Sequence, residues 1–364
     1  MKDIAIIGAG ILGLAQAYVH AKRGHRVRVY ERSPKASGAS VRNFGMIWPV
    51  GQPAGLLCDL AMRSREIWLE FLEEAKLPYL PTGSLHVAYR ADEEAVAREF
   101  AEREPSRARW IDPAEVLERS GWVVAEGLRG ALFSEHEIVV DPRLILSQLP
   151  VFLAEKYGVV FSFGTAVTDI KKLSADRVFV CSGDDFETLY PEVYAGSGVT
   201  RCKLQMMRTG PQPDGWSMGP ALAGGLTLRF YQSFRVCESL AALSARIAEE
   251  MPLYEKYGIH VMASQTNDGC VTLGDSHEYG LEVDIFNKQE IDDLVLAYLR
   301  GFARFPNMAI AERWHGVYAR HFDRPFFYEQ PEPEVFIVTA SAGKGMTVSF
   351  GLADLLYENP SSSF

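Results

Sequence analysis

A glycine-rich turn near the start of the chain has the residue types and spacing that bind a diphosphate. Residues 8–13 read GAGILG between an apolar stretch at 4–7 and a run of helical character that ends near Gly24. Such glycines allow a tight turn, and the first N–H groups of the helix meet the phosphates. Glu31 ends the next strand, where a carboxylate binds the ribose hydroxyls and disfavours a 2′-phosphate. We predict FAD or NAD rather than NADP, with contacts from Gly8, Gly10, Ile11, Leu12, Gly13, Glu31 and Arg32.

A second glycine-bounded loop, GASVRNFGM at 38–46, favours FAD over NAD. Nicotinamide enzymes normally continue from the acid into another strand and helix, whereas this loop offers a hydroxyl, polar donors and bare backbone. We expect Ser40 to face a phosphate, and Gly45 and Met46 to lie against a flavin ring. The alternative is a surface loop with a solvated arginine. The predicted contacts are Gly38, Ala39, Ser40, Arg42, Asn43, Gly45 and Met46.

The stretch EVFIVTASAGKGMTVSFGLADLLYE, 334–358, predicts a strand, a glycine turn and a helix whose N-terminus faces the cofactor. Backbone donors there would favour negative charge on the flavin. Lys344 is the best candidate for electrostatic support of catalysis, and the alternative is a solvated turn residue. The predicted contacts are Gly343, Lys344, Gly345, Met346 and Thr347.

Together, IIGAGILGLAQAY, GASVRNFGM and SAGKGMTVSFGLA resemble the D-amino-acid oxidase superfamily of FAD-dependent amine oxidoreductases, which includes glycine and sarcosine oxidases. Within it, VRNFGMIWPVGQPAG and WHGVYARHF resemble a bacterial subfamily proposed to act in aminophosphonate breakdown. The resemblance implies oxidation of a small primary or N-methylated amine by hydride transfer to flavin N5, followed by hydrolysis of the imine.

The resemblance also implies how FAD is held. The backbone near Val167 would meet the adenine, and Ser182 and Gly183 would contact the cofactor after a strand at 177–185. Relatives with covalent flavin have a histidine in the segment matching 38–46 or a cysteine downstream of that matching 314–322. This chain has neither, so we expect non-covalent FAD.

Substrate contacts are expected on the strand at 314–322. Many amino-acid oxidases carry W-x-G-x-R there, with the arginine on a substrate carboxylate, and Tyr318 stands in that place. Arg320 lies two residues on, hence on the same strand face, with His321 beside it. Because a phosphonate needs more positive charge than a carboxylate, we expect an anionic substrate anchored by Arg320. A structural salt bridge is the alternative for Arg320.

Weaker candidates come from the middle of the chain. Arg229 and Tyr231 are expected on one face of a strand at 225–234. Met46 and Trp48 are expected to wall the ring and the pocket, and Met46 is also taken as a catalytic candidate. His277 is interpreted as a loop residue rather than a catalyst.

The predicted fold class is α/β: a discontinuous Rossmann-type, glutathione-reductase-like FAD-binding domain with an α+β substrate domain on a mixed or antiparallel sheet. The FAD-binding domain takes residues 1–80, 139–200 and 306–364, and the substrate domain takes 81–138 and 201–305. Helices are expected at 56–77, 91–105, 238–249 and 288–304, strands at 83–90, 202–209, 225–234, 258–266 and 270–276, and a helix–strand–turn–strand unit at 139–170.

Composition excludes several function classes. A formal net charge of −10 over 364 residues argues against nucleic-acid binding. Five cysteines without a C-x-x-C pair indicate reduced thiols, and eight histidines without metal spacing lead us to assign no metal site. We expect no membrane span and a cytoplasmic location. The expected partner is a small anionic amine, and a homo-oligomer is possible in this prediction. The tail at Ser361–Ser363 is expected to be loose.

Two other functions share the N-terminal motif. An FAD-dependent monooxygenase would show G-D before the last cofactor helix, where this chain has Ala342-Gly343-Lys344-Gly345. A non-catalytic flavin-binding accessory subunit would bind FAD without turning over an amine.

Overall fold

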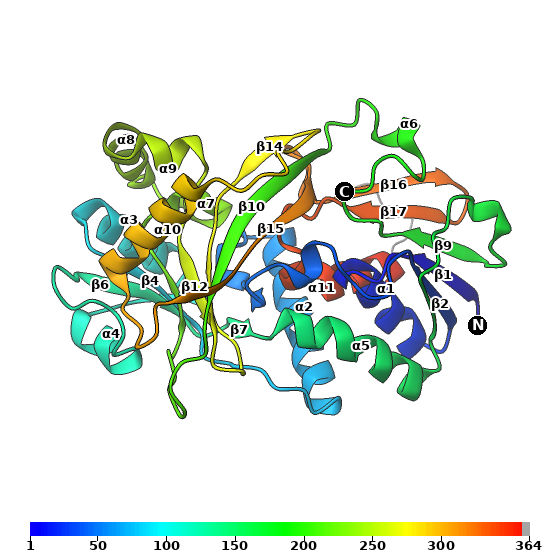
Figure 1. The fold of residues 1–364 in the computed structure, drawn as a ribbon, viewed down its shortest axis with the longest axis horizontal. Coiled ribbons are helices and arrows are strands. Elements are labelled where there is room, and N and C mark those ends of the chain that lie inside the picture. The colour runs from blue at the N-terminus through cyan, green and yellow to red at the C-terminus, as the bar shows by residue number, and fades with distance from the viewer. Residues whose placement is uncertain (359–364) are drawn as a thin grey trace.

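A computed structural model describes residues 1–358, and the serine run 361–363 lies outside them. Within these residues, Figure 1 shows a sheet near the N-terminus with the strand order β16-β17-β9-β1-β2-β8. Its pairs are parallel except for antiparallel β16–β17, as the buried apolar strands at 4–7 and 177–180 predict. Its strands are β1 (Asp3–Ile7), β2 (Arg26–Glu31), β8 (Val160–Phe163), β9 (Arg177–Val180), β16 (Phe327–Glu332) and β17 (Val335–Thr339).

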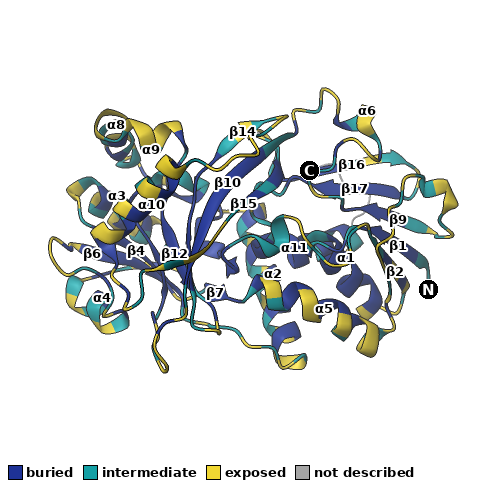
Figure 2. Ribbon diagram, in the orientation of Figure 1, coloured by how far each residue is buried: buried dark blue, intermediate teal, exposed yellow. Residues whose placement is uncertain are grey.

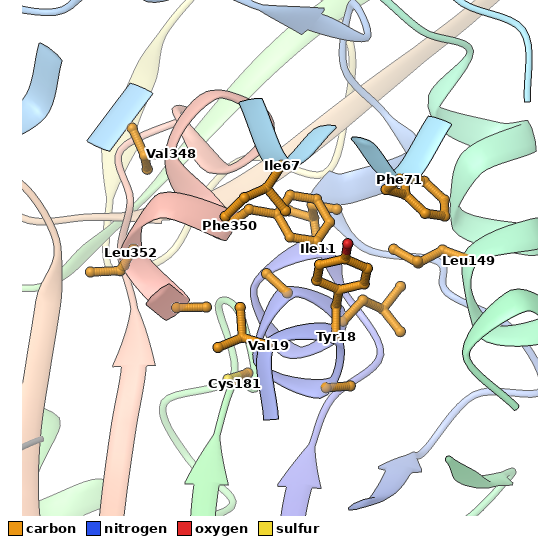
Figure 3. Packing of buried hydrophobic residues seen from close by; sticks show 14 of the residues in the cluster. Ile11, Tyr18, Val19, Ile67, Phe71, Leu149, Cys181, Val348, Phe350 and Leu352 are labelled. Carbon is orange, nitrogen blue, oxygen red and sulfur yellow. The ribbon is translucent and has the colours of Figure 1, made fainter. Parts of the chain in front are cut away.

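Helices cover one face of this sheet. In the core beneath them, Tyr18, Phe71 and Phe350 are fully buried, and the Tyr18 and Phe350 ring centroids lie 5.5 Å apart (Figure 3). The residues on either side of β9, 167–175 and 186–199, pack on the other face and include the 3₁₀ turn η3 (Ile170–Lys172) and α6 (Pro191–Tyr194). The covering helices are α1 (Ile11–Lys22), α2 (Leu56–Glu74), α5 (Pro142–Tyr157) and α11 (Gly345–Glu358).

A larger sheet forms the other half of the molecule (Figure 1). Its pairs are antiparallel except for parallel β4–β11, and β15 lies along β10. In order it contains β14 (Glu278–Gly280), β10 (Thr200–Thr209), β13 (Val271–Gly274), β12 (Met262–Gln265), β11 (Ala221–Ala223), β4 (Ser84–Ala88), β6 (Gly130–Ser134) and β5 (Arg109–Ile111), with β15 (Ile310–Arg320) beside β10. A separate ladder pairs β3 (Met46–Ile47) with β7 (Ile138–Val139).

Both faces of the larger sheet are covered. Side chains of α10 pack on one face, and those of α3 and α8 pack on the other together with β3. The outer surfaces of these helices are exposed whereas the strands beneath are buried (Figure 2). The helices here are α3 (Ala91–Arg103), α4 (Pro113–Arg119), α7 (Leu226–Phe230), α8 (Leu240–Glu250), α9 (Pro252–Lys256) and α10 (Gln289–Phe302), with 3₁₀ turns η1 (Ala39–Val41), η2 (Pro49–Gly51) and η4 (Gln232–Val236).

The predicted fold class is confirmed, and one boundary differs from the prediction. The strand at 310–320 pairs with β10 in the larger sheet, whereas it was assigned to the third FAD-binding segment. The long antiparallel register from Thr200 opposite Arg320 to Thr209 opposite Ile310 holds it there. If each domain is defined by the sheet that its strands join, the third FAD-binding segment starts after residue 320. The other predicted domain boundaries remain a proposal.

Two predicted strands are wrong. Residues 225–234 form α7 and η4, with Leu226, Thr227 and Leu228 all buried between neighbouring helices. A short apolar run is compatible with the periodicity of a strand and with that of a helix, so tertiary packing determines which of the two forms. Residues 165–170 also form no strand, and the Asp169 side chain accepts a hydrogen bond from the Lys171 N–H to start η3.

Of the helices in residues 1–358, none combines the length and the apolar character that crossing a bilayer requires.

Candidate active site

The turn between β1 and α1 and the first turn of α1 require glycine at positions 8 and 13. Gly8 has φ +104°, and a Cβ there would lie 2.3 Å from the Cys181 carbonyl oxygen. A Cβ on Gly13 would lie 2.0 Å from the Gly8 carbonyl oxygen. The turn therefore packs tightly against β9 and opens the start of α1, at Gly10 and Ile11, toward a cavity.

Glu31 is fixed at the end of β2, facing the same cavity. Its carboxylate accepts hydrogen bonds from the N–H groups of Ala9 and Ser33, each at 2.9 Å. Arg32 also lines the cavity and forms an ion pair with Asp185 at 2.8 Å. This end of the cavity thus carries a preoriented carboxylate suited to ribose hydroxyls.

The loop 38–46 is braced by its own side chains. Asn43 Nδ2 donates to the carbonyls of Ala39 and Ser40 at 3.1 and 2.9 Å, and the Gly45 N–H donates to Asn43 Oδ1 at 2.8 Å. Ser40 Oγ accepts from the Ile11 N–H at 3.0 Å, which joins the loop to the start of α1. The loop is therefore held against the diphosphate end of the cavity.

The C-terminal turn meets this loop. The Trp48 N–H donates to Thr347 Oγ1 at 3.0 Å, just beyond the loop and one turn into α11. Met46 and Lys344 line the same cavity. The two segments that were predicted to enclose one ring system thus lie side by side.

One cavity of about 650 Å³ connects all these elements, a size typical of cofactor and ligand sites. Two predicted contacts, Gly13 and Gly45, lie behind the wall, and their absent side chains let neighbouring backbone approach. The other predicted contacts on its wall are Gly8, Gly10, Ile11, Leu12, Glu31, Arg32, Gly38, Ala39, Ser40, Arg42, Asn43, Met46, Val167, Ser182, Gly183, Gly343, Lys344, Gly345, Met346 and Thr347.

This wall fits FAD. It combines a glycine cradle, two helix N-termini and a carboxylate at one end with a largely apolar end at Met46, Trp48 and Met262. The first set of groups suits a diphosphate and ribose, and the second suits a flat aromatic ring.

Lys344 is a partly buried cation on the cavity wall. No hydrogen bond or ion pair joins its Nζ to any described residue. Burial, with the Arg320 guanidinium nearby, lowers the pKa of the Lys344 ammonium to about 8. An unpaired cation at the start of α11 favours negative charge in this part of the cavity.

Of the two predicted substrate contacts on β15, Tyr318 and Arg320, only one lines the cavity. Tyr318 is buried on the cavity wall, and burial raises the pKa of its hydroxyl. Arg320 lies outside the wall, where its Nη1 donates to the Tyr279 hydroxyl at 3.0 Å and its guanidinium stacks near Tyr279 and Phe322. Arg320 thus lies beside the site and not on its lining.

His321 and Arg229 do not reach the cavity. The His321 ring contacts the Ser197 carbonyl at 2.9 Å. Arg229 forms an ion pair with Glu255 at 3.1 Å, because α7 replaces the expected strand and turns its side chain away. Tyr231, which was predicted on the same strand face as Arg229, does line the cavity.

Sequence reasoning missed a buried polar cluster on the wall. His260, Asp275 and His277 have exposed fractions of 1%, 5% and 6% and come together from the ends of β12 and β13. The interpretation of His277 as a loop residue is incomplete, since it belongs to the cavity. The sequence did contain a signal for this cluster, because the turn at 267–269 joins β12 and β13 into an antiparallel hairpin. The register of that hairpin brings His260 next to residues 275–277.

Comparison with known proteins identifies the family. The model described as "DAO: FAD dependent oxidoreductase" matches residues 3–359. The chain belongs to the DAO family. FAD is the cofactor of that family, and the motif-based resemblance to the D-amino-acid oxidase superfamily is confirmed.

Individual relatives support the DAO assignment. Glycine oxidase from Geobacillus kaustophilus strain HTA426 is 26% identical over 212 residues, so the alignment spans about half of each protein, 55% of both. The crystal structure of glycine oxidase from Geobacillus kaustophilus has a TM-score of 0.75 at 18% identity, covering 98% of this chain and 94% of that one. L-proline dehydrogenase from P. horikoshii has a TM-score of 0.74 at 19% identity, covering 100% and 94%. At these identities the structures establish the fold alone.

Proposed function

We propose that this DAO-family chain oxidises a small primary or N-methylated amine that carries an anionic group, with an aminophosphonate as the leading substrate. The oxidation would be supplied by non-covalent FAD, to whose N5 the substrate's α C–H passes as a hydride equivalent before water hydrolyses the imine. The supporting observation is Lys344, a cation without a carboxylate partner on the wall of the FAD cavity.

Lys344 on the cavity wall, with Arg320 beside the site, would supply the positive charge that an anionic substrate needs. Arg320 is near enough to lower the pKa of Lys344, and its buried Nε has no hydrogen-bond partner among the described residues. Tyr318, where many relatives carry a carboxylate-binding arginine, offers a neutral hydroxyl instead. Two separated cations and a hydroxyl suit a tetrahedral phosphonate better than one bidentate arginine would.

The apolar end of the cavity would keep water from the reacting carbon. Met46, Trp48 and Met262 are buried there, and the Tyr231 ring lies near Trp48, with their centroids 6.4 Å apart. A dry surround strengthens the electrostatic effect of the nearby cations.

The test is anaerobic mixing of the purified protein with glycine, N-methylglycine, D-alanine and 2-aminoethylphosphonate while the flavin absorption is followed. Bleaching by at least one amine is expected, fastest with the phosphonate. Protein without flavin absorption, or flavin that no amine bleaches, would contradict the proposal. Reduction by NADPH with no amine present would indicate a monooxygenase, and FAD without turnover in a stable hetero-oligomer would indicate an accessory subunit.

Arg320→Ala tests the anionic part of the proposal. We expect about 10-fold or greater weakening of binding for anionic substrates, with FAD retained. Arg300→Ala is the matched control, because it removes the same charge from an exposed position on α10. Unchanged kinetics in Arg320→Ala would remove Arg320 from the site.

The cytoplasm is the proposed location. The five cysteines form no disulfide in the described part of the chain, as expected of a reducing compartment.

A further inference from the structure

The cluster of His260, Asp275 and His277 lines the cavity beside aromatic residues of α7 and β15. The Phe230 ring stacks on His260, with their centroids 3.9 Å apart, and His277 lies edge-on to Tyr318. A carboxyl and two imidazoles buried together need partners that compensate the loss of water. Their surroundings therefore indicate a ligand that supplies hydrogen bonds.

The hydrogen bonds leave two acceptors facing each other. His277 Nδ1 lies 2.9 Å from the Gly258 carbonyl oxygen, so Nδ1 carries the hydrogen and Nε2 presents a lone pair. His277 Nε2 lies 3.9 Å from Asp275 Oδ2, which is too long for a hydrogen bond. His260 Nε2 lies 3.1 Å from the other carboxylate oxygen, Asp275 Oδ1, but forms no hydrogen bond with it, so this buried oxygen is an acceptor without a hydrogen-bond partner in residues 1–358.

An N–H donor of positive charge complements these two acceptors better than a metal ion does. The potential ligand atoms of the cluster lie within 4.8 Å of one another. Tetrahedral zinc with bonds near 2.0 Å needs its ligand atoms only about 3.3 Å apart. The 3.9 Å between Asp275 Oδ2 and His277 Nε2 exceeds that spacing, and the cluster faces the space where an amine would be oxidised.

We propose that Asp275 and His277 bind the ammonium group of the substrate and accept the proton that it must lose before oxidation, with His260 as a positioning residue. The proton moves from nitrogen to the cluster: R–NH₃⁺ and the Asp275 carboxylate become R–NH₂ and the carboxylic acid. No electrons are transferred in this step. The proposal rests on the proposed amine oxidation.

The electrostatics of the site are consistent with this proton transfer. Burial raises the pKa of the Asp275 carboxyl, and burial with Arg320 nearby lowers the pKa of His277 to about 4. In a dry site, a neutral amine beside a neutral acid is favoured over an ion pair. The other titratable or charged groups facing the cluster are His86 on β4, Cys202 on β10, Tyr231 in the α7–η4 connection, Tyr279 on β14, and Tyr318 and Arg320 on β15, with Lys344 on the same cavity wall.

The first experiment compares the pH profile of kcat/KM in the FAD-loaded wild type and in Asp275→Asn, using the amine that bleaches the flavin fastest. In the wild type kcat/KM should rise with pH only until Asp275 ionises. The variant lacks the acceptor, so only free amine reacts, and kcat/KM should fall about 100-fold or more at neutral pH. Its kcat/KM should then climb toward the wild-type value as pH approaches the amine's own pKa.

The second experiment measures binding without turnover. 2-Aminoisobutyrate and 2-amino-2-methylpropylphosphonate have no C–H on the carbon that bears nitrogen, so they cannot be oxidised. Their binding is read from the perturbed FAD spectrum of wild type, Asp275→Asn and His277→Gln. Wild-type affinity should be nearly constant between the pKa of Asp275 and that of the amine, whereas affinity of Asp275→Asn should increase about tenfold per pH unit.

Two results would overturn the proposal. One is a pH profile in both variants parallel to that of the wild type, because a purely structural role lowers activity equally at every pH. The other is one divalent metal ion per wild-type chain that Asp275→Asn loses, which would make the cluster a metal site. If no amine bleaches the wild-type flavin, the proposed function fails, and that result is separate from these two.

Discussion

At the scale of single residues, the charge of the cavity depends on Lys344. Its Nζ has no described partner, and its pKa of about 8 lies close to physiological pH. A lysine this perturbed inside a cleft is typical of a functional site. It differs from the ion-paired Arg32 and Arg229, whose charges are already compensated by Asp185 and Glu255.

Lys344→Met should abolish a pH dependence that the wild type has. Because the pKa is lowered, the wild-type cation is present below about pH 8 and is lost above it, so affinity for an anionic ligand should fall as pH rises through 8. The methionine variant should bind such a ligand about 10-fold to 100-fold more weakly below pH 8, with no fall above it. Titration of the FAD spectrum with the ligand on both sides of pH 8 measures this.

Lys344→Arg is the matched control, since an arginine stays charged across the whole range. It should keep the affinity of the wild type and extend it to alkaline pH. An alkaline fall that persists in Lys344→Met would assign the titration to another group.

The position of a residue could be predicted where local sequence determines it, whereas its role as a contact remains a proposal. Glu31 and Ser40 could be placed because each lies a few residues from a glycine turn with a defined geometry. Asp275 and His277 could not, since their proximity to His260 depends on the register of a hairpin. Burial of such polar groups is a property of the tertiary structure that no spacing reveals.

At the scale of elements, the loop 38–46 depends on the absence of a side chain at Gly45. This residue has φ +73°, and a Cβ would lie 1.9 Å from the Val140 carbonyl oxygen, before α5. The contact is with backbone, so a larger residue must displace either the loop or the start of α5. The position of Met46, and with it the wall of the cavity, follows from that contact.

Gly45→Ala should therefore weaken FAD binding about 10-fold or more, through both the strained φ and the displaced loop. The FAD content of the purified protein and an FAD titration by fluorescence measure this. Gly121→Ala is the control, because its φ is outside the left-handed region, no atom lies within 4 Å of the Cβ position, and the residue does not line the cavity. Equal FAD affinity in the two variants would show that the loop tolerates displacement.

Elements with a strong local signal were predicted well. The helices at 56–74 and 289–302 have clear apolar faces, and the glycine turns fix where α1 and α11 begin. The expected strand at 225–234 became α7, since three consecutive buried residues there pack among other helices. Short apolar runs carry too little periodicity to resist such packing.

At the scale of the whole molecule, the cavity lies between the two sheets and takes wall residues from both. Ile7 and Glu31 belong to the first sheet, and Met206, Met262 and Tyr318 belong to the larger one. A ligand that fills this space contacts both halves and binds only the folded chain. The cofactor should consequently stabilise the protein as a unit.

Removal of FAD should lower Tm, and Tm of the apoprotein should rise with added FAD. With free FAD 1,000-fold above its Kd, the expected gain in unfolding free energy is about 4 kcal/mol. Differential scanning fluorimetry over a series of FAD concentrations measures this, with riboflavin, which lacks the diphosphate and adenosine, as the control. A Tm independent of FAD would contradict a cofactor shared by the two halves.

The position of α11 has a consequence for biosynthesis. This helix, built from residues 345–358, packs between α1 and α2, and β17 separates β9 from β16. The nucleotide-binding half thus joins the first and last described elements, which gives the chain many contacts between distant segments. A polypeptide emerging from the ribosome cannot close the flavin site until α11 has been made, so capture of FAD must follow synthesis of this helix, and the growing chain must avoid aggregation without its ligand until then.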